Sequence, residues 1–255
     1  MRQFSAGERM IRRALRRALY PSLGKIVRGS MAVGEILPPY QSFYVNGVYT
    51  EGRRDTLSMY YGLNLPRNLE GWSWLDLGCN EGSIVMLAAQ DGAHPVVGVE
   101  LYDKFLGRGQ ERVAQSGLNA KVVRGDIIEY VRDADSFDVV SLFAMVRHVH
   151  RAMMVHGGHS VRNQGQPYLI YDAYRTIIKG EDNPVKEEMD GFLETCLAKA
   201  RRHFVCSIKD QSGLIRRRKE DVIAYFRGLS DRVGDVEIYS LVRDQQYIVI
   251  QVAMK

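Results

Sequence analysis

The sequence predicts an α/β fold built on a mostly parallel sheet, and two observations support this prediction. Patterns typical of buried strands alternate along the chain with patterns typical of amphipathic helices, an order that gives a parallel sheet with helices on both faces. The last two strand patterns are joined by only residues 243–245, so these two strands must be antiparallel. Strands are expected near residues 73–77, 95–100, 121–124, 137–143, 203–208, 235–242 and 246–254.

The composition is that of an ordinary globular chain. Its 255 residues are 45% hydrophobic and 25% charged, which is enough to bury a full core. No window approaches the ~18 to 20 apolar residues that a membrane span needs. Cys79, Cys196 and Cys206 are widely spaced and odd in number, so they predict small buried side chains in a reducing compartment, not a disulfide framework. We therefore expect a cytoplasmic protein.

Positive charge is concentrated at the N-terminus. Residues 1–34 hold eight basic residues and one acidic residue, which gives +7 in a chain whose net charge is +5, so the remainder carries −2. A body with this charge does not fit an extended nucleic-acid channel, and no DNA partner is expected.

Apolar residues recur at helical spacing over residues 4–20, arginines lie mainly on the other faces, and Pro21 ends the pattern. Three interpretations of this helix stay open. It docks on the body with its arginines solvated, it binds an anionic membrane surface, or it contacts RNA phosphates. An arginine-rich leader also resembles an organellar transit peptide.

The most informative stretch joins the first strand of the predicted sheet to a helix over about 83–90. The joining turn carries Gly78, Asn80 and Gly82. Glycine permits positive φ and close approach to a ligand, and asparagine is among the few other residues that tolerate the left-handed region. The first amides of the helix face the crevice. Two glycines of a G-x-G-x-x-G loop are absent, and Asp76 at the strand end favours a cationic ligand over a pyrophosphate.

The next three strands also end in residues suited to a nucleotide-like ligand. Glu100 ends the second strand about twenty residues after the turn, where a carboxylate accepts hydrogen bonds from ribose hydroxyls. Asp126 and Ile127 follow the third strand, and Phe143 ends the fourth. In a parallel sheet these strand ends meet at one edge. For each acidic residue taken singly, helix capping or loop solvation is the alternative.

The pattern Asp-x-Gly-x-Asn-x-Gly at residues 76–82 resembles motif I of the class I S-adenosylmethionine (SAM) methyltransferases, and the fourth strand is similar to their motif IV. This resemblance implies SAM as the cofactor. It also implies a Rossmann-like methyltransferase fold with seven strands in the order 3-2-1-4-5-7-6, the last strand antiparallel. Asp126 would take the adenine amino group, and Ile127 would pack on the ring. We expect the methyltransferase domain over residues 38–255, after a helical extension over 1–37.

Over roughly residues 38–160 the chain resembles the methyltransferase module of bacterial O-antigen chain-terminating enzymes. The likeness rests on Tyr40, Arg54, the Gly-Cys-Asn turn and a histidine-rich turn after the fourth strand. It implies that Tyr40 and Arg54 contact SAM, with Arg54 paired to its carboxylate. The alternative for Arg54 is a surface arginine beside Asp55. The Gly-Cys-Asn turn is also similar to that of the tRNA wobble-uridine carboxymethyltransferase-like group.

The connection over about 145–182 is long enough to be a lid or an acceptor-binding element. It holds four of the six histidines of the chain, at positions 148, 150, 156 and 159. Methyl transfer to a hydroxyl benefits from a base near neutral pH, which predicts His148 as the catalytic base and His150 as the second candidate. The alternatives are histidines in purely structural roles and a metal site. No carboxylate or cysteine is interleaved with the histidines, so no metal is expected.

The resemblance therefore predicts a SAM-dependent methyltransferase that methylates an oxygen atom of a saccharide or small polar metabolite. The alternative acceptor is RNA, tRNA included, which the basic leader and the basic run at 216–219 favour. The alternative for this run is a structural one, in which its basic side chains are simply the solvated start of a helix. A SAM-binding protein without catalysis is the alternative from another class. Peripheral membrane association through residues 4–20 is the alternative to a purely cytoplasmic location.

Overall fold

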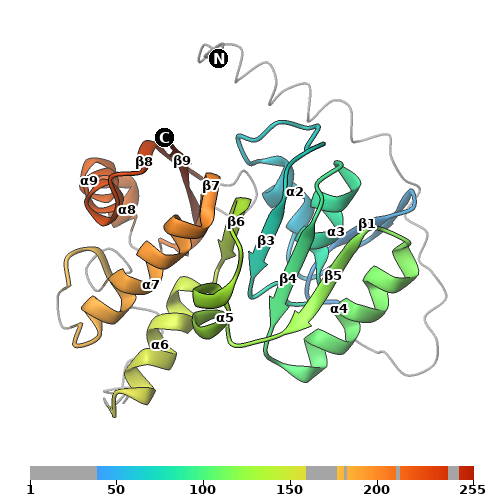
Figure 1. Ribbon diagram of the computed structural model, residues 1–255, viewed down its shortest axis with the longest axis horizontal. Helices are drawn as coiled ribbons and strands as arrows, with labels where there is room; N and C mark the ends of the chain where they lie inside the picture. The colour runs from blue at the N-terminus through green and yellow to red at the C-terminus, as the bar shows by residue number, and fades with distance from the viewer. Residues whose placement is uncertain (1–38, 159–176, 181–182, 211–212, 241–246) are drawn as a thin grey trace.

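The computed structural model describes residues 39–158, 177–180, 183–210, 213–240 and 247–255 (Figure 1). The predicted N-terminal extension, including the amphipathic segment over 4–20 for which a membrane surface is one possible partner, lies outside the described residues, as does part of the predicted insertion. The main sheet comprises β3 (Trp74–Leu77), β4 (Val96–Glu100), β5 (Ala120–Arg124), β6 (Phe137–Phe143), β7 (Ala200–Lys209), β8 (Val233–Ser240) and β9 (Tyr247–Met254).

The seven strands lie in the order β5-β4-β3-β6-β7-β9-β8, which confirms the predicted order. The first five are parallel, and β9 runs antiparallel to both of its neighbours. All residues of β3, β4 and β6 are buried. Helices cover both faces of these strands, which is why they read as continuous apolar runs in the sequence. β7 begins at Ala200, three residues before the predicted start.

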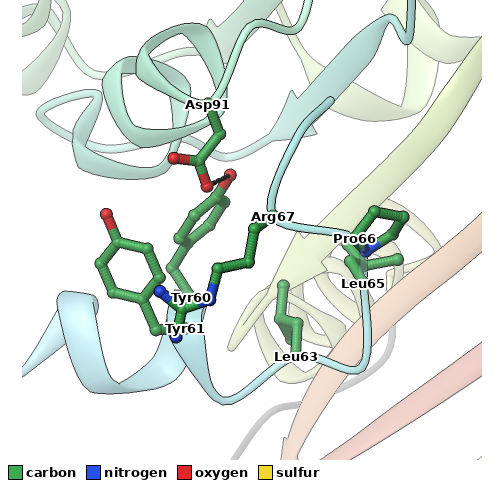
Figure 2. Close-up of a pocket in the computed structure, with 7 residues that line it drawn as sticks. All are labelled: Tyr60, Tyr61, Leu63, Leu65, Pro66, Arg67 and Asp91. Atoms are coloured by element: carbon green, nitrogen blue, oxygen red, sulfur yellow. Dashed lines mark hydrogen bonds between the residues drawn. The ribbon is translucent and has the colours of Figure 1, made fainter. Parts of the chain in front are cut away.

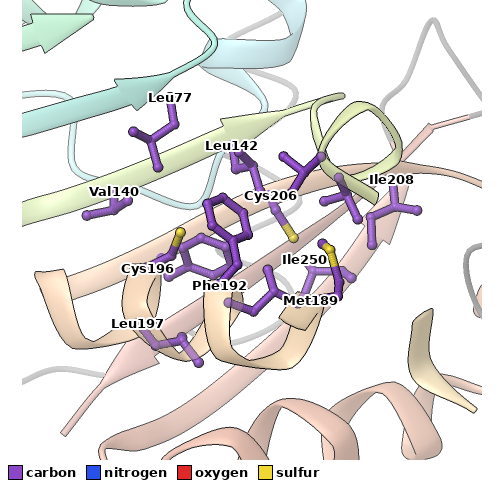
Figure 3. Packing of buried hydrophobic residues seen from close by; sticks show 14 of the residues in the cluster. Leu77, Val140, Leu142, Met189, Phe192, Cys196, Leu197, Cys206, Ile208 and Ile250 are labelled. Atoms are coloured by element: carbon purple, nitrogen blue, oxygen red, sulfur yellow. The ribbon is translucent and has the colours of Figure 1, made fainter. Parts of the chain in front are cut away.

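Two layers of helices enclose the sheet (Figure 1). One face packs against α3 (Ser83–Gln90) and α4 (Asp103–Ser116), and the other against α5, α6 and α7. Figure 3 shows the second core, in which Met189, Phe192 and Cys196 of α7 meet Leu142 of β6 and Cys206 of β7. The remaining helices after β5 are α5 (Ile127–Asp133), α6 (Val146–His156), α7 (Lys186–Lys199), α8 (Leu214–Arg217) and α9 (Lys219–Leu229).

A small N-terminal unit packs against the start of α3. It consists of the antiparallel pair β1 (Phe43–Val45) and β2 (Val48–Thr50), followed by α2 (Thr56–Tyr61). Ser83 Oγ donates a hydrogen bond of 2.6 Å to the carbonyl of Ser42, and Ser83 N donates one of 3.2 Å to Gln41 Oε1. This unit therefore reaches the carboxyl edge of the sheet, where α3 begins.

The three cysteines are buried and free, as the sequence predicted. Within the described part of the chain, no helix has the length and apolar character needed to cross a membrane.

Candidate cofactor site

The turn between β3 and α3 has the backbone conformation that its residues predict. Gly78, Asn80 and Gly82 have φ values of 75°, 55° and 82°. The amides of Gly78 and Cys79 both donate to the carbonyl of Val99, at 2.9 and 3.0 Å, which ties the turn to β4. Because only glycine and a few polar residues adopt these angles readily, the sequence of the turn is fixed by its geometry.

The space at the glycines is taken by protein side chains. A Cβ at Gly78 would lie 2.5 Å from Met145 Cγ, and one at Gly82 would lie 3.3 Å from Val122 Cγ2. A side chain at either position would therefore meet the chain's own side chains, and the predicted close approach of a ligand to the backbone here stays a prediction. Gly98 in the middle of β4 plays the same part, because a Cβ there would lie 2.6 Å from Cys79 Sγ. A glycine inside a strand is the sequence signal that could have identified it.

Asp76 is a buried carboxyl at the centre of the site. Ser141 Oγ donates to its Oδ1 at 2.7 Å. Burial and the nearby Glu100 carboxylate raise the pKa of Asp76 to about 7, while the Ser141 hydrogen bond and the Arg54 charge act in the opposite direction. The groups around Asp76 compensate only part of the charge of its carboxylate. Such a carboxylate is suited to a cationic ligand.

Glu100 is bound to the backbone around it. Its Oε2 accepts from the amide of Asn80, and its Oε1 accepts from the amides of Leu101 and Tyr102, each at 2.9 Å. A carboxylate offers about four acceptor positions, so roughly one remains, on Oε2. Glu100 thus joins the turn to the connection that leads into α4, and its predicted contact with ribose hydroxyls stays a prediction.

Asp126 adopts the capping arrangement that was the alternative for it. Its Oδ1 accepts from the amide of Ile128 at 2.8 Å and caps α5. Ile127 and Phe143 are both buried in the cores that flank the sheet. Their predicted contacts with the cofactor stay predictions, as does the contact of Asp126 with the adenine amino group.

Tyr40 and Arg54 are brought together by the backbone, since the amide of Arg54 donates to the carbonyl of Tyr40 at 2.9 Å. The Arg54 guanidinium lies over the ring of Tyr247, 4.9 Å from its centre, and its charge acts on Asp76. Asp55, the alternative partner of Arg54, accepts from the amide of Ser58 at 3.0 Å and caps α2. The two residues implied by the resemblance therefore lie in one strip of chain beside the site.

The two candidate histidines occupy different faces of α6. His148 lies at the surface in the first turn of the helix, where partial burial and the charges of Arg147 and Arg151 lower its pKa. His150 is buried, and its Nε2 lies 2.9 Å from Asn183 Oδ1. Of the two, His150 has the arrangement expected of a structural histidine. His159 lies outside the described residues.

The chain turns sharply between β6 and α6. Ala144 has a φ of 58°, uncommon for a residue with a Cβ, and its amide donates to Ser207 Oγ at 2.9 Å. This turn places Met145 over Gly78 and starts α6 at the carboxyl edge of the sheet. In the described ranges, no three His, Cys, Asp or Glu side chains are grouped to hold a metal ion.

Glu81 is a residue of the turn that sequence reasoning missed. Its side chain is fully buried and forms ion pairs with Arg108 at 3.1 Å and Arg112 at 2.7 Å, both from α4. Arg112 also lies over the ring of Phe43, 4.2 Å from its centre. Little in the sequence indicated this role, because the arginine partners of Glu81 lie more than twenty-five residues away in the chain.

Figure 2 shows a pocket at the opposite edge of the sheet. Asp91, which accepts a hydrogen bond of 3.0 Å from the hydroxyl of Tyr60, comes directly after α3. A helix that follows a parallel strand runs back along it, so the end of α3 lies away from the carboxyl edge. The pocket is lined by Tyr60, Tyr61, Leu63, Leu65, Pro66, Arg67 and Asp91 and is not part of the site.

Residues 75–163 match the family of methyltransferase domains. This match begins in β3 and includes the turn, β4, β5, β6 and α6. The matched stretch therefore looks like a methyltransferase domain. The cofactor implied for such a domain is SAM, and the residues fit it: SAM carries positive charge on its sulfonium and ammonium groups, and Asp76 is a buried carboxyl with an incompletely compensated charge.

This chain is similar to proteins of several kinds. The ribosomal protein L11 methyltransferase of Phocaeicola vulgatus is 29% identical over 90 residues, which are 35% of this chain and 32% of that protein, so the chain spans about a third of this relative. The crystal structure of WbdD has a TM-score of 0.50 at 16% identity, covering 87% of this chain and 46% of that chain. The magnesium protoporphyrin IX methyltransferase of Synechocystis PCC 6803 with bound SAM has a TM-score of 0.45 at 16% identity, covering 78% of this chain and 76% of that chain.

Proposed function

We propose that this methyltransferase domain transfers the methyl group of SAM to an oxygen atom of a saccharide or a related small polar metabolite. The observation that carries the proposal is the position of His148, in the first turn of α6 directly after β6. The lowered pKa of His148 favours the neutral imidazole near pH 7, which is the form that accepts a proton. The resemblance to the O-antigen chain-terminating enzymes supports a saccharide acceptor.

In this proposal the chain's own residues have separate tasks. Asp76 provides negative charge toward the bound cofactor, and the β3–α3 turn presents backbone that would approach it closely. His148 accepts the proton of the acceptor hydroxyl as the oxygen attacks the methyl carbon. SAM supplies the methyl group, which leaves its sulfur as the carbon–oxygen bond forms.

RNA is the alternative acceptor, and the ion pairs of the basic run speak against it. Arg216 Nε lies 3.1 Å from Oδ2 of the fully buried Asp210, and Arg218 lies 2.6 Å from Asp221 Oδ2. Arginines engaged in this way are less available to phosphates than a free run would be. The L11 relative is named for a ribosomal protein acceptor, so a protein acceptor belongs in the same screen.

The first test measures SAM binding by calorimetry. Glu100→Ala should weaken SAM binding by roughly 1 to 3 kcal/mol, because hydrogen bonds to a charged acceptor are lost. Asp55→Ala is the control. Asp55 is also a carboxylate that accepts a backbone amide, but it caps α2 and lies outside the turn. An unchanged dissociation constant in Glu100→Ala, or tight NAD binding by the wild type, would contradict the cofactor site.

The second test measures turnover with methyl-labelled SAM after a screen of saccharides, RNA and ribosomal proteins. His148→Ala should lower turnover by about a hundredfold or more and leave SAM affinity nearly unchanged. His156→Ala is the matched control, since this histidine is exposed at the other end of α6. Full activity of His148→Ala would remove His148 from the mechanism. Label transfer to none of the acceptors, with SAM still bound, would favour the non-catalytic alternative.

We also propose that residues 38–255 form the methyltransferase domain and that residues 1–37 govern location or partner choice, at a membrane surface or in the cytoplasm. Deleting residues 1–20 should therefore leave SAM affinity unchanged. A folded truncated protein that no longer binds SAM would make the extension part of the site.

A further inference from the structure

A buried chain of hydrogen bonds leads from Trp74 to Asp76. Trp74 and Ser141 are both fully buried, on the neighbouring strands β3 and β6. Trp74 Nε1 donates to Ser141 Oγ at 2.8 Å, and Ser141 Oγ donates to Asp76 Oδ1 at 2.7 Å. An indole nitrogen can only donate, so the hydroxyl accepts from Trp74 and has its single hydrogen free for another partner. The carboxylate is the stronger partner, because the other acceptor, the carbonyl of Leu75, is 3.4 Å away.

The register of the sheet explains why these three side chains meet. Asp76 and Ser141 are directly opposite each other in the parallel pair of β3 and β6. Trp74 precedes Asp76 by two residues and therefore shares its face of the sheet. The indole is itself held by Tyr60, whose ring centre lies 5.7 Å away and whose hydroxyl bonds to Asp91. The hydroxyl of Ser141 is thus fixed from both sides.

Asp76 has few other groups that favour its charge. Glu100 approaches it from β4 and disfavours the charge, and Cys79 in the turn is neutral because burial raises the pKa of its thiol. Arg54 favours the charge from the segment before α2. Among the residues that the structure describes, Ser141 is the one whose side chain donates a hydrogen bond to this carboxylate.

We propose that Ser141, oriented by Trp74, is a positioning residue that keeps the Asp76 carboxylate charged and fixed for the cation of SAM. The inference rests on the proposed binding of SAM at this site. It assigns a part in cofactor binding to two core residues that do not touch the ligand. If the inference holds, the hydrogen-bond chain sets the pH at which SAM affinity rises. A purely structural role for Ser141 would not affect that pH.

The test is calorimetric titration of SAM between pH 5.5 and 9. In the wild type, affinity should rise with pH through about 7, where Asp76 ionises. Above about pH 8 the α-amino group of SAM loses its proton, an effect common to the wild type and both variants. Ser141→Ala should move this rise to higher pH. A displacement of one pH unit would lower affinity about fivefold at pH 7 and would be nearly absent at pH 9. Trp74→Phe keeps the ring bulk without the N–H group, and should move the rise in the same direction by less.

Adenosine serves as the control ligand, because it lacks both cationic groups of SAM. Its affinity should be the same in the wild type and both variants across this pH range. Two results in Ser141→Ala would overturn the inference: SAM binding weakened equally at every pH, or a pH profile that does not shift. Neither result would contradict the proposal that this site binds SAM. Failure of the wild type to bind SAM would overturn the proposed function itself. If Ser141→Ala does not fold, an unshifted profile in Trp74→Phe decides against the proposal.

Discussion

Two aspartates on neighbouring strands of one sheet differ in how their charge is compensated. Asp76, near the carboxyl end of β3, receives one side-chain hydrogen bond, and its pKa is raised to about 7. Asp138, at the amino end of β6, accepts from the amide and hydroxyl of Ser73, both at 2.8 Å, and pairs with Arg201 at 2.9 Å and Arg202 at 3.0 Å. Burial alone would raise its pKa, but Arg201 and Ser73 hold it well below its usual range.

The difference separates a structural carboxylate from one suited to a ligand. The chain supplies Asp138 with donors from two other segments, so its charge stabilises the fold. Asp76 is buried with less compensation, so its charge costs stability unless a cation binds. Such incomplete compensation at the carboxyl edge fits a ligand site of an α/β fold.

The largest effect is expected from Asp76→Asn. The folded pKa lies above the unfolded value of 3.8, so ionisation opposes folding increasingly from about pH 4 to pH 7 and fully above it. The variant should therefore be more stable than the wild type at pH 8, by up to about 4 kcal/mol, with little gain near pH 4. It should also lose at least about tenfold in SAM affinity.

Denaturant unfolding at pH 4 and pH 8 measures the change in stability, and calorimetry measures the change in SAM affinity. A variant that is less stable than the wild type at pH 8 would mean that the chain compensates the Asp76 charge fully.

Asp138→Asn should give the opposite pair of results. It leaves Arg201 and Arg202 without their carboxylate, and should lower the free energy of unfolding by about 1 to 3 kcal/mol at pH 7, since both arginines are half exposed. SAM affinity should be unchanged, because Asp138 lies at the amino edge. Loss of SAM binding in a folded Asp138→Asn protein would show that the two edges are coupled.

The sequence was sufficient for the fold because strand and helix patterns are local. The buried runs at β3, β4 and β6 predicted a mostly parallel sheet, and the short link before β9 predicted an antiparallel pair. The strand order came from the methyltransferase resemblance. The left-handed turn was predictable for the same reason, since Gly78 and Asn80 adopt its angles by themselves.

The partners of the site residues could not be predicted in the same way. Glu81 pairs with arginines one helix away, and Asp76 with a serine 65 residues on. Gly78 lies against Met145, which follows the neighbouring strand β6. These contacts depend on which strands become neighbours, and the resemblance named ligand roles without naming the chain's own contacts.

The smallest effect is expected at His203, beside Asp138 on the amino edge. Its ring stacks on Trp72 at 5.8 Å, and burial and the charge of Arg202 lower its pKa to about 4. The unfolded pKa is about 6.5, so the native state resists protonation, and stability should fall as pH drops from 6.5 through 4. Asp76 acts in the opposite direction over nearly the same range, because its protonation relieves a cost.

His203→Gln removes one of these opposing contributions. Between pH 7 and pH 4 the variant should lose about 1 kcal/mol less stability than the wild type, a value reduced to allow for the partial exposure of the ring. Asp76→Asn should lose more than the wild type over the same range, because the compensating gain is gone. Urea unfolding followed by tryptophan fluorescence measures both. Parallel plots of unfolding free energy against pH for the wild type and His203→Gln would contradict this prediction. They would show that the imidazole is protonated as readily in the folded as in the unfolded chain, so that His203 contributes nothing to the loss of stability in acid.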